Sequence, residues 1–300
     1  MPEQNVVQPN QPHRAAGNRS GGARRKRGAK AWIPDQHGAW AMLILPPLLG
    51  AFTAGFNWHH LPFLLAWWGG YFLYQAWAKW VKVRGPRKAE YRAPLAVYGA
   101  VTGVGAVVSV ATAPALLWWG AALAPLIAVA AVEVLRHNER SLLSGISTVL
   151  AAGLTLPIAV SLGPNKPHFS TPLGTPGAGM SDAAWIGTAI LTAYFLGTVL
   201  HVKALIRERN STAYWVATSL WHDVIALSAV AIAMSGPVWL SVRPLALWLQ
   251  VPLWIGLAAR TWTMVRNQHR GKRYTPKQIG VPEIAISLVV GASVVPFLLG

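Results

Sequence analysis

Residues 32–50 read Trp-Ile-Pro-Asp-Gln-His-Gly-Ala-Trp-Ala-Met-Leu-Ile-Leu-Pro-Pro-Leu-Leu-Gly, and the character of the chain changes within this stretch. The residues before it are polar and basic, whereas those after it form long apolar runs separated by short basic segments. Crossing the hydrocarbon core of a bilayer takes about 20 helical residues, so the stretch predicts the start of a polytopic membrane protein. Asp35 and His37 lie at the mouth of its first span, and ionisable groups at membrane depth are candidate functional residues.

The composition favours an all-α membrane bundle over a soluble protein. Of the 300 residues, 53% are hydrophobic and only 12% are charged, which leaves too little polar surface for a soluble domain. The apolar runs are continuous and lack the alternation of barrel strands, so helices are expected. The chain has no cysteine, which excludes disulfides, thiolate metal sites and thiol nucleophiles.

The spacing of the apolar runs predicts about nine transmembrane helices, and the placement of lysine and arginine orients them. The predicted spans are 38–56, 61–80, 94–112, 115–135, 142–162, 184–205, 213–233, 238–259 and 281–299. All but Lys166 and Arg243 of the 26 lysines and arginines then fall on one side of the membrane. Because basic loops stay in the cytoplasm, we expect a multi-pass protein of the cell (plasma) membrane with a cytoplasmic N-terminus and a C-terminus outside.

The net charge of +17 comes from these loops and from the N-terminal tail. Residues 1–31 lack apolar periodicity and are predicted to form a disordered, basic cytoplasmic tail before a transmembrane domain at 32–300. The basic run 24–27 could contact nucleic acid, but beside a first span it is expected to hold the tail at the anionic lipid surface. Membrane lipids and no nucleic acid are therefore the expected partners, and the oligomeric state stays open.

Polar and ionisable residues gather near the cytoplasmic span ends, where they could line a net-positive cavity for an anionic headgroup, phosphate or diphosphate. Four of them, spaced i, i+3, i+4 and i+7 between Glu133 and Arg140, share one helical face. His201, Leu205 and Glu208 share another. The alternative is that such side chains only snorkel or end helices. No catalytic residue is assigned. The candidate ligand-binding residues are Asp35, His37, Gln75, Lys79, Arg87, Arg92, Glu133, His137, His201, Lys203, Arg207, Glu208 and Glu283.

His222 and Asp223 lie near the middle of the predicted span 213–233, where a carboxylate is costly without a partner. They form a candidate proton or ion relay, as in a transporter. The alternative is a later helix start, or an Asp223 that is neutral or paired with a basic residue. No metal or cofactor is predicted, because no two carboxylates have the spacing of a Mg²⁺ site and no His-x-x-x-His pair lies within a span.

Residues 34–42, which contain the motif His-Gly-Ala-Trp, resemble the signature of the YwiC-like family of bacterial membrane proteins. Residues 196–203 and 207–209 fit the same family. The resemblance spans most of residues 32–300. It implies a location in a bacterial membrane and implies no particular reaction.

A weaker resemblance is to the UbiA prenyltransferase superfamily, in the number and orientation of the spans and in the basic loops after spans two and six. Residues 84–95 look like that superfamily's arginine-rich segment, with one residue inserted. The superfamily's aspartates bind Mg²⁺ and a prenyl diphosphate, but their approximate places here hold Gln75, Ala78 and Lys82. The second aspartate segment falls near residues 201–208. The resemblance therefore implies a shared scaffold in which lysine and histidine meet phosphate oxygens without metal.

Three functions stay open on these grounds. The first is a UbiA-like bundle that binds an anionic lipid or isoprenoid headgroup in a basic cytoplasmic cavity and could act as a divergent, metal-independent transferase. The second is a secondary transporter or channel that uses His222 and Asp223. The third is a non-catalytic membrane subunit that docks a partner through its tail and basic loops. We prefer the first as an architecture and assign no enzymatic reaction.

Overall fold

The fold is known from a computed structural model that describes residues 31–33, 39–164, 181–236 and 243–299. Asp35, His37 and Lys166 lie outside the described residues, as does the predicted tail up to residue 30. The described part is all-α, as predicted, and contains no strand. Its helices are α2 (Ala39–Thr53), α3 (His60–Lys82), α4 (Arg92–Thr112), α5 (Leu116–Leu135), α6 (Leu142–Ser161), α7 (Asp182–Val202), α8 (Thr212–Ser235), α9 (Pro244–His269) and α10 (Pro276–Leu298). Two short segments of other helix types adjoin them. The 3₁₀-helix η1 (Gly85–Tyr91) is wound more tightly than an α-helix, and the π-helix η2 (Lys203–Arg207) is wound more widely.

Six helical segments of the described chain are long and apolar enough to cross a membrane: Gly85–Thr112, Leu116–Leu135, Leu142–Ser161, Asp182–Arg207, Thr212–Ser235 and Pro276–Leu298. Helix α2 is apolar but shorter, and α3 and α9 carry more polar residues. Large apolar side chains stay exposed on the outside, for example Val107 on α4 and Leu227 on α8, each 69% exposed. Since soluble proteins rarely expose so much contiguous apolar surface, these helices indicate a membrane protein.

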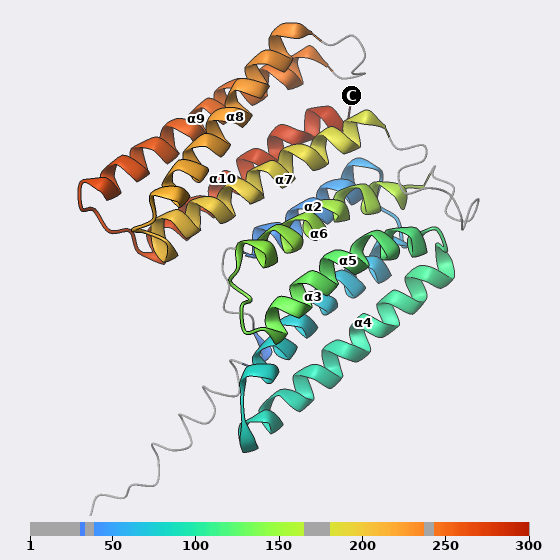
Figure 1. Cartoon of the computed structure of the whole chain (residues 1–300). Helices are drawn as coiled ribbons and strands as arrows, with labels where there is room; N and C mark the ends of the chain where they lie inside the picture. The colour runs from blue at the N-terminus through green and yellow to red at the C-terminus, as the bar shows by residue number, and fades with distance from the viewer. Residues whose placement is uncertain (1–30, 34–38, 165–180, 237–242, 300) are drawn as a thin grey trace, which may run out of the picture.

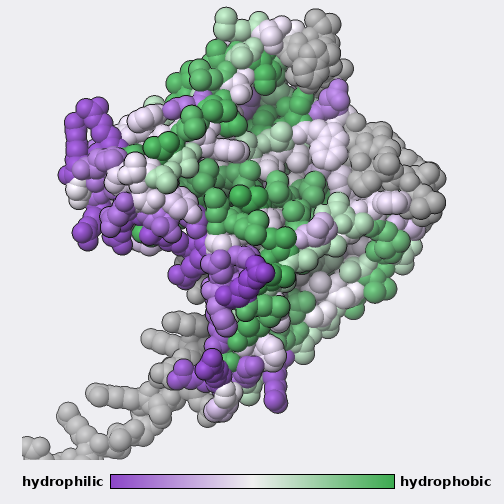
Figure 2. Space-filling model, in the orientation of Figure 1, coloured by the Kyte–Doolittle hydropathy of each residue, from purple (hydrophilic) through white to green (hydrophobic). Residues whose placement is uncertain are grey.

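The helices pack side by side in a long array, with α4 at one end and the pair α8 and α9 at the other (Figure 1). Helix α6 contacts α2, α5 and α7, and α7 in turn contacts α10 and α8. Figure 2 shows hydrophilic residues gathered along one edge of the array and hydrophobic residues across the face beside it. We call this edge the basic end. It holds the connections α3–α4, α5–α6, α7–α8 and α9–α10.

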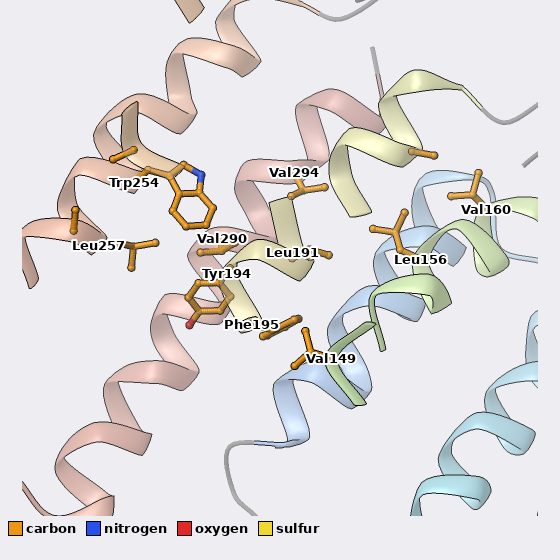
Figure 3. Close-up of a cluster of buried hydrophobic side chains, with 13 residues drawn as sticks. Val149, Leu156, Val160, Leu191, Tyr194, Phe195, Trp254, Leu257, Val290 and Val294 are labelled. Carbon is orange, nitrogen blue, oxygen red and sulfur yellow. The ribbon is translucent and has the colours of Figure 1, made fainter. Parts of the chain in front are cut away.

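Apolar side chains from both halves of the chain meet in one core (Figure 3). Leu156 of α6 packs with Leu191 of α7 and Val294 of α10, and all three are fully buried. Trp254 of α9 extends the same core toward α8. The core therefore fixes α7 and α10 against their neighbours, and these two helices carry most of the buried polar groups described below.

Candidate functional site

The end of α7 is held by a buried lysine. Lys203 begins the π-helix η2, whose wider turn re-aims side chains relative to an α-helix and is frequent at functional sites. The residue is only 5% exposed, and its Nζ donates to the carbonyl of Arg140 at 2.7 Å. The ammonium also lies over the ring of Tyr214, 5.6 Å from the ring centroid. A charged lysine is rarely buried unless other groups compensate its charge. Here the Arg140 carbonyl and the Tyr214 ring do so.

A hollow opens at the basic end, where η2 ends and the α7–α8 connection begins. It has a volume of about 420 Å³ and is lined by residues 207–211, which include Arg207, Glu208 and Arg209. Arg140 lies close enough to Arg207 for their like charges to interact. We call this hollow, together with Lys203 and Arg140, the basic pocket. The basic pocket and its surroundings hold four cations and two carboxylates, Glu208 and the Glu139 that pairs with Arg140 at 4.0 Å, so an excess of positive charge remains.

The α5–α6 turn carries Arg140, which joins the basic pocket through its contact with Lys203. Glu133 is only 4% exposed, and its Oε2 accepts from Asn138 Nδ2 at 3.0 Å. His137 has the left-handed φ of 56° that closes the end of α5. Glu139 forms an ion pair with Lys82 at the end of α3. Glu133 and His137 therefore hold the turn that presents the Arg140 carbonyl to Lys203, rather than facing the hollow themselves.

A second polar cluster lies deeper, between α7, α9 and α10. Glu283 is 6% exposed, and its Oε1 pairs with Arg260 Nη1 at 2.7 Å. Its Oε2 accepts from the Tyr194 hydroxyl at 2.7 Å and from Thr198 Oγ1 at 3.4 Å. The Tyr194 hydroxyl also lies 3.1 Å from Ser287 Oγ, and it points away from the apolar side chains around its ring (Figure 3). We call these five residues the buried network.

Two histidines lie beside the buried network. His201 is 1% exposed, and its ring centroid is 6.1 Å from that of His222. His222 Nδ1 donates to the carbonyl of Thr218 at 2.7 Å, one turn earlier on α8. Within the described residues, both ring nitrogens of His201 and Nη2 of Arg260 have no hydrogen-bond partner. These polar atoms lie beside the Arg260–Glu283 ion pair, so polar and charged groups are concentrated at this depth of the bundle.

The two members of the predicted relay face different surroundings. His222 is buried and turned toward His201, whereas Asp223 is half-buried and accepts from Trp262 Nε1 at 3.0 Å with both carboxylate oxygens. Consecutive residues on an α-helix project about 100° apart, which separates the two side chains. The structure therefore places His222 with His201 and leaves Asp223 on the outer face of α8 and α9.

The remaining predicted site residues lie at separate places. Gln75 is buried on α3, and Lys79, one turn later, donates to the carbonyl of Ile33 at 3.4 Å. Arg87 and Arg92 are exposed on η1 and at the start of α4. Of the predicted set, the structure brings Lys203, Arg207 and Glu208 together in the basic pocket, and it places His201 and Glu283 in or beside the buried network.

Comparison with known proteins identifies the family. A family profile described as "YwiC-like protein" matches residues 33–160. The chain is 33% identical over 192 residues to "Uncharacterized protein YwiC" of Bacillus subtilis (strain 168), an alignment that covers 62% of this chain and 72% of the relative. The chain belongs to the YwiC-like family. This YwiC-like protein is also 26% identical over 199 residues to an "Uncharacterized protein" of Haemophilus influenzae (strain ATCC 51907 / DSM 11121 / KW20 / Rd), across 66% of this chain and 77% of the relative. No solved structure matches it, so the resemblance to the UbiA superfamily stays a prediction.

The spacing of Tyr194, Thr198 and Ser287, which were not among the predicted site residues, indicates their place in the buried network. Tyr194, Thr198 and His201 follow the spacing i, i+4 and i+7, which places them on one face of α7. Glu283 and Ser287 have the same i, i+4 relation on α10. Tyrosine, threonine and serine at these positions supply the hydrogen-bond donors that a buried carboxylate needs.

Proposed function

We propose that this YwiC-like protein binds the anionic headgroup of a membrane lipid or isoprenoid in the basic pocket. The observation that carries the proposal is the gathering of Lys203, Arg140 and Arg207 at the basic end, where Arg207 lines a hollow. Like charges repel one another, so a fold that holds three of them together gains most from an anion placed between them. The proposal assigns no chemical reaction to the protein.

The chemistry of the basic pocket suits phosphate oxygens. Arginine presents planar, paired N–H donors that match phosphate, and lysine adds a compact positive charge. Lys203 Nζ donates to the Arg140 carbonyl, and its positive charge adds to the attraction that the arginines exert on an anion. Serine and asparagine at the rim, Ser211 and Asn210, add uncharged hydrogen-bonding groups. Since the pocket opens at the end of α7, the acyl or prenyl chain of such a ligand could stay in the bilayer.

The Arg207→Gln variant tests this proposal. Losing one charge-assisted hydrogen bond is expected to weaken binding of an anionic headgroup about tenfold or more. The measurement is native mass spectrometry of the purified full chain with added phosphatidylglycerol, farnesyl diphosphate or phosphatidylcholine. We expect one of the two anionic ligands to bind in preference to phosphatidylcholine, and that ligand identifies the headgroup class.

The matched control is Lys277→Gln, which removes one exposed positive charge from the same end of the molecule, in the first turn of α10. It should leave binding unchanged. Equal loss of binding in both variants would show attraction to overall charge and not to the basic pocket. Indifference of the wild-type chain to both anionic ligands would refute the proposal.

We further propose that the nine described helices α2–α10 all cross the plasma membrane, with the basic end in the cytoplasm. The alternation of the connections between the two ends supports this topology, because the basic connections all lie at one end. The chain has no native cysteine, so single cysteines can report their side of the membrane. In intact cells, a membrane-impermeant maleimide is expected to label Ser235→Cys, at the end of α8, and to leave Arg273→Cys, between α9 and α10, unlabelled until the cells are opened. Labelling of both variants in intact cells would place both ends of α9 outside and would show that α9 does not cross the membrane.

A further inference from the structure

A carboxylate lies on the outer face of two membrane helices. Asp223 is in the middle of α8, about 17 Å from the first residue of the helix at 1.5 Å per residue. Its side chain is half-buried, and its hydrogen-bond donor is the indole of Trp262, at 3.0 Å from each oxygen. Trp262 is itself 53% exposed. Among the described residues no lysine, arginine or histidine forms an ion pair with Asp223.

The surface around Asp223 is apolar and exposed. Leu220 and Leu227 lie at i−3 and i+4 on the same face of α8 and are 58% and 69% exposed. Ile255, two turns before Trp262 on α9, is 49% exposed. A carboxylate among such side chains faces lipid if nothing covers it, and ionised groups at that depth are expensive without a partner. A single indole N–H compensates only part of a full negative charge.

We propose that this face of α8 and α9 docks a partner transmembrane helix that carries a lysine or arginine at the depth of Asp223. Charge complementarity selects this occupant, since an opposite charge is the group that a carboxylate in lipid attracts most strongly. Within the residues that the structure describes, a second copy of this chain offers no such cation. Arg260, the basic residue nearest that depth on α9, is paired with Glu283, and His222 is turned inward toward His201. The other described lysines and arginines lie at or near helix ends.

The test uses a designed peptide as the partner. The fluorescently labelled full chain is reconstituted in phosphatidylcholine vesicles with an acceptor-labelled polyleucine helix that carries one central lysine, and association is measured by energy transfer. The same helix with a central leucine or glutamate serves as the control. We expect the lysine helix to associate about tenfold more tightly than the leucine helix, and the glutamate helix to associate no better than leucine.

Two variants of the chain complete the design. Asp223→Asn keeps the shape of the side chain and an oxygen for Trp262 but removes the charge, and it should abolish the preference for lysine. Asp223→Glu should retain that preference. Equal association of the lysine and leucine helices with the wild-type chain would overturn the proposal. Energy transfer between wild-type chains that disappears in Asp223→Asn without any peptide would overturn it as well, because a second copy would then cover the face.

Discussion

Replacing Arg260 with methionine is expected to lower the free energy of unfolding by roughly 3–5 kcal/mol. The variant leaves the Glu283 carboxylate buried at 6% exposure without the guanidinium that lies 2.7 Å from it. Tyr194 and Thr198 still donate hydrogen bonds, but neither carries a positive charge. The measurement is unfolding of the purified chain in mixed micelles by increasing sodium dodecyl sulfate, followed by circular dichroism.

A double variant separates the pair interaction from general damage. Arg260→Met combined with Glu283→Gln removes both charges and should recover much of the loss, because a neutral pair needs no compensation. The glutamine oxygen can still accept from Tyr194. If the double variant instead loses the sum of the two single effects, the two side chains are not coupled and the ion pair contributes nothing specific.

The second large effect is expected where α3 and α4 touch. Gly105 of α4 is packed against the backbone of α3, and an added Cβ would lie 2.6 Å from the nitrogen of Ala66 and 2.8 Å from the carbonyl oxygen of Pro62. Backbone atoms cannot turn aside as a flexible side chain can. Gly105→Ala is therefore expected to force the helices apart and to destabilise the protein by about 1–3 kcal/mol in the same unfolding assay.

A glycine two residues away supplies the matched control. Gly103 lies on the outer side of α4, and an added Cβ there would meet nothing within 4 Å. Gly103→Ala should leave stability unchanged or raise it by up to about 1 kcal/mol, because alanine favours the helix more than glycine. A loss of stability in Gly103→Ala that equals the loss in Gly105→Ala would contradict the close contact between α3 and α4.

Local patterns of the sequence were sufficient to locate the helices. Each predicted span overlaps one helix, since apolar length and helix-forming residues depend on neighbours along the chain. The same patterns failed where the helix type changes. His201, Leu205 and Glu208 were predicted to share one α-helical face, but the π-helix η2 shifts the register after Val202. His201 and Leu205 are buried, while Glu208 lines the hollow of the basic pocket.

Of the candidate site, the residue types could be predicted but their partners could not. Glu283 was recognised as a polar residue near a span end, yet its partners come from helices that are remote in the sequence, with Tyr194 lying 89 residues away. Lys203 likewise meets the carbonyl of Arg140, 63 residues earlier. Such contacts depend on which helices are neighbours in the bundle and on how each is rotated about its axis.

The sequence by itself determined that this protein is an all-α membrane protein of the YwiC-like family, because apolar length and the family motif are properties of contiguous residues. Only the tertiary structure decided that the side chains of His222 and Asp223 lie apart. His222 faces the buried His201 of α7, whereas Asp223 faces outward and accepts a hydrogen bond from Trp262. The physical reason is that the packing of α8 against α7 and α9 fixes its rotation, and that rotation determines which of two adjacent side chains reaches the interior.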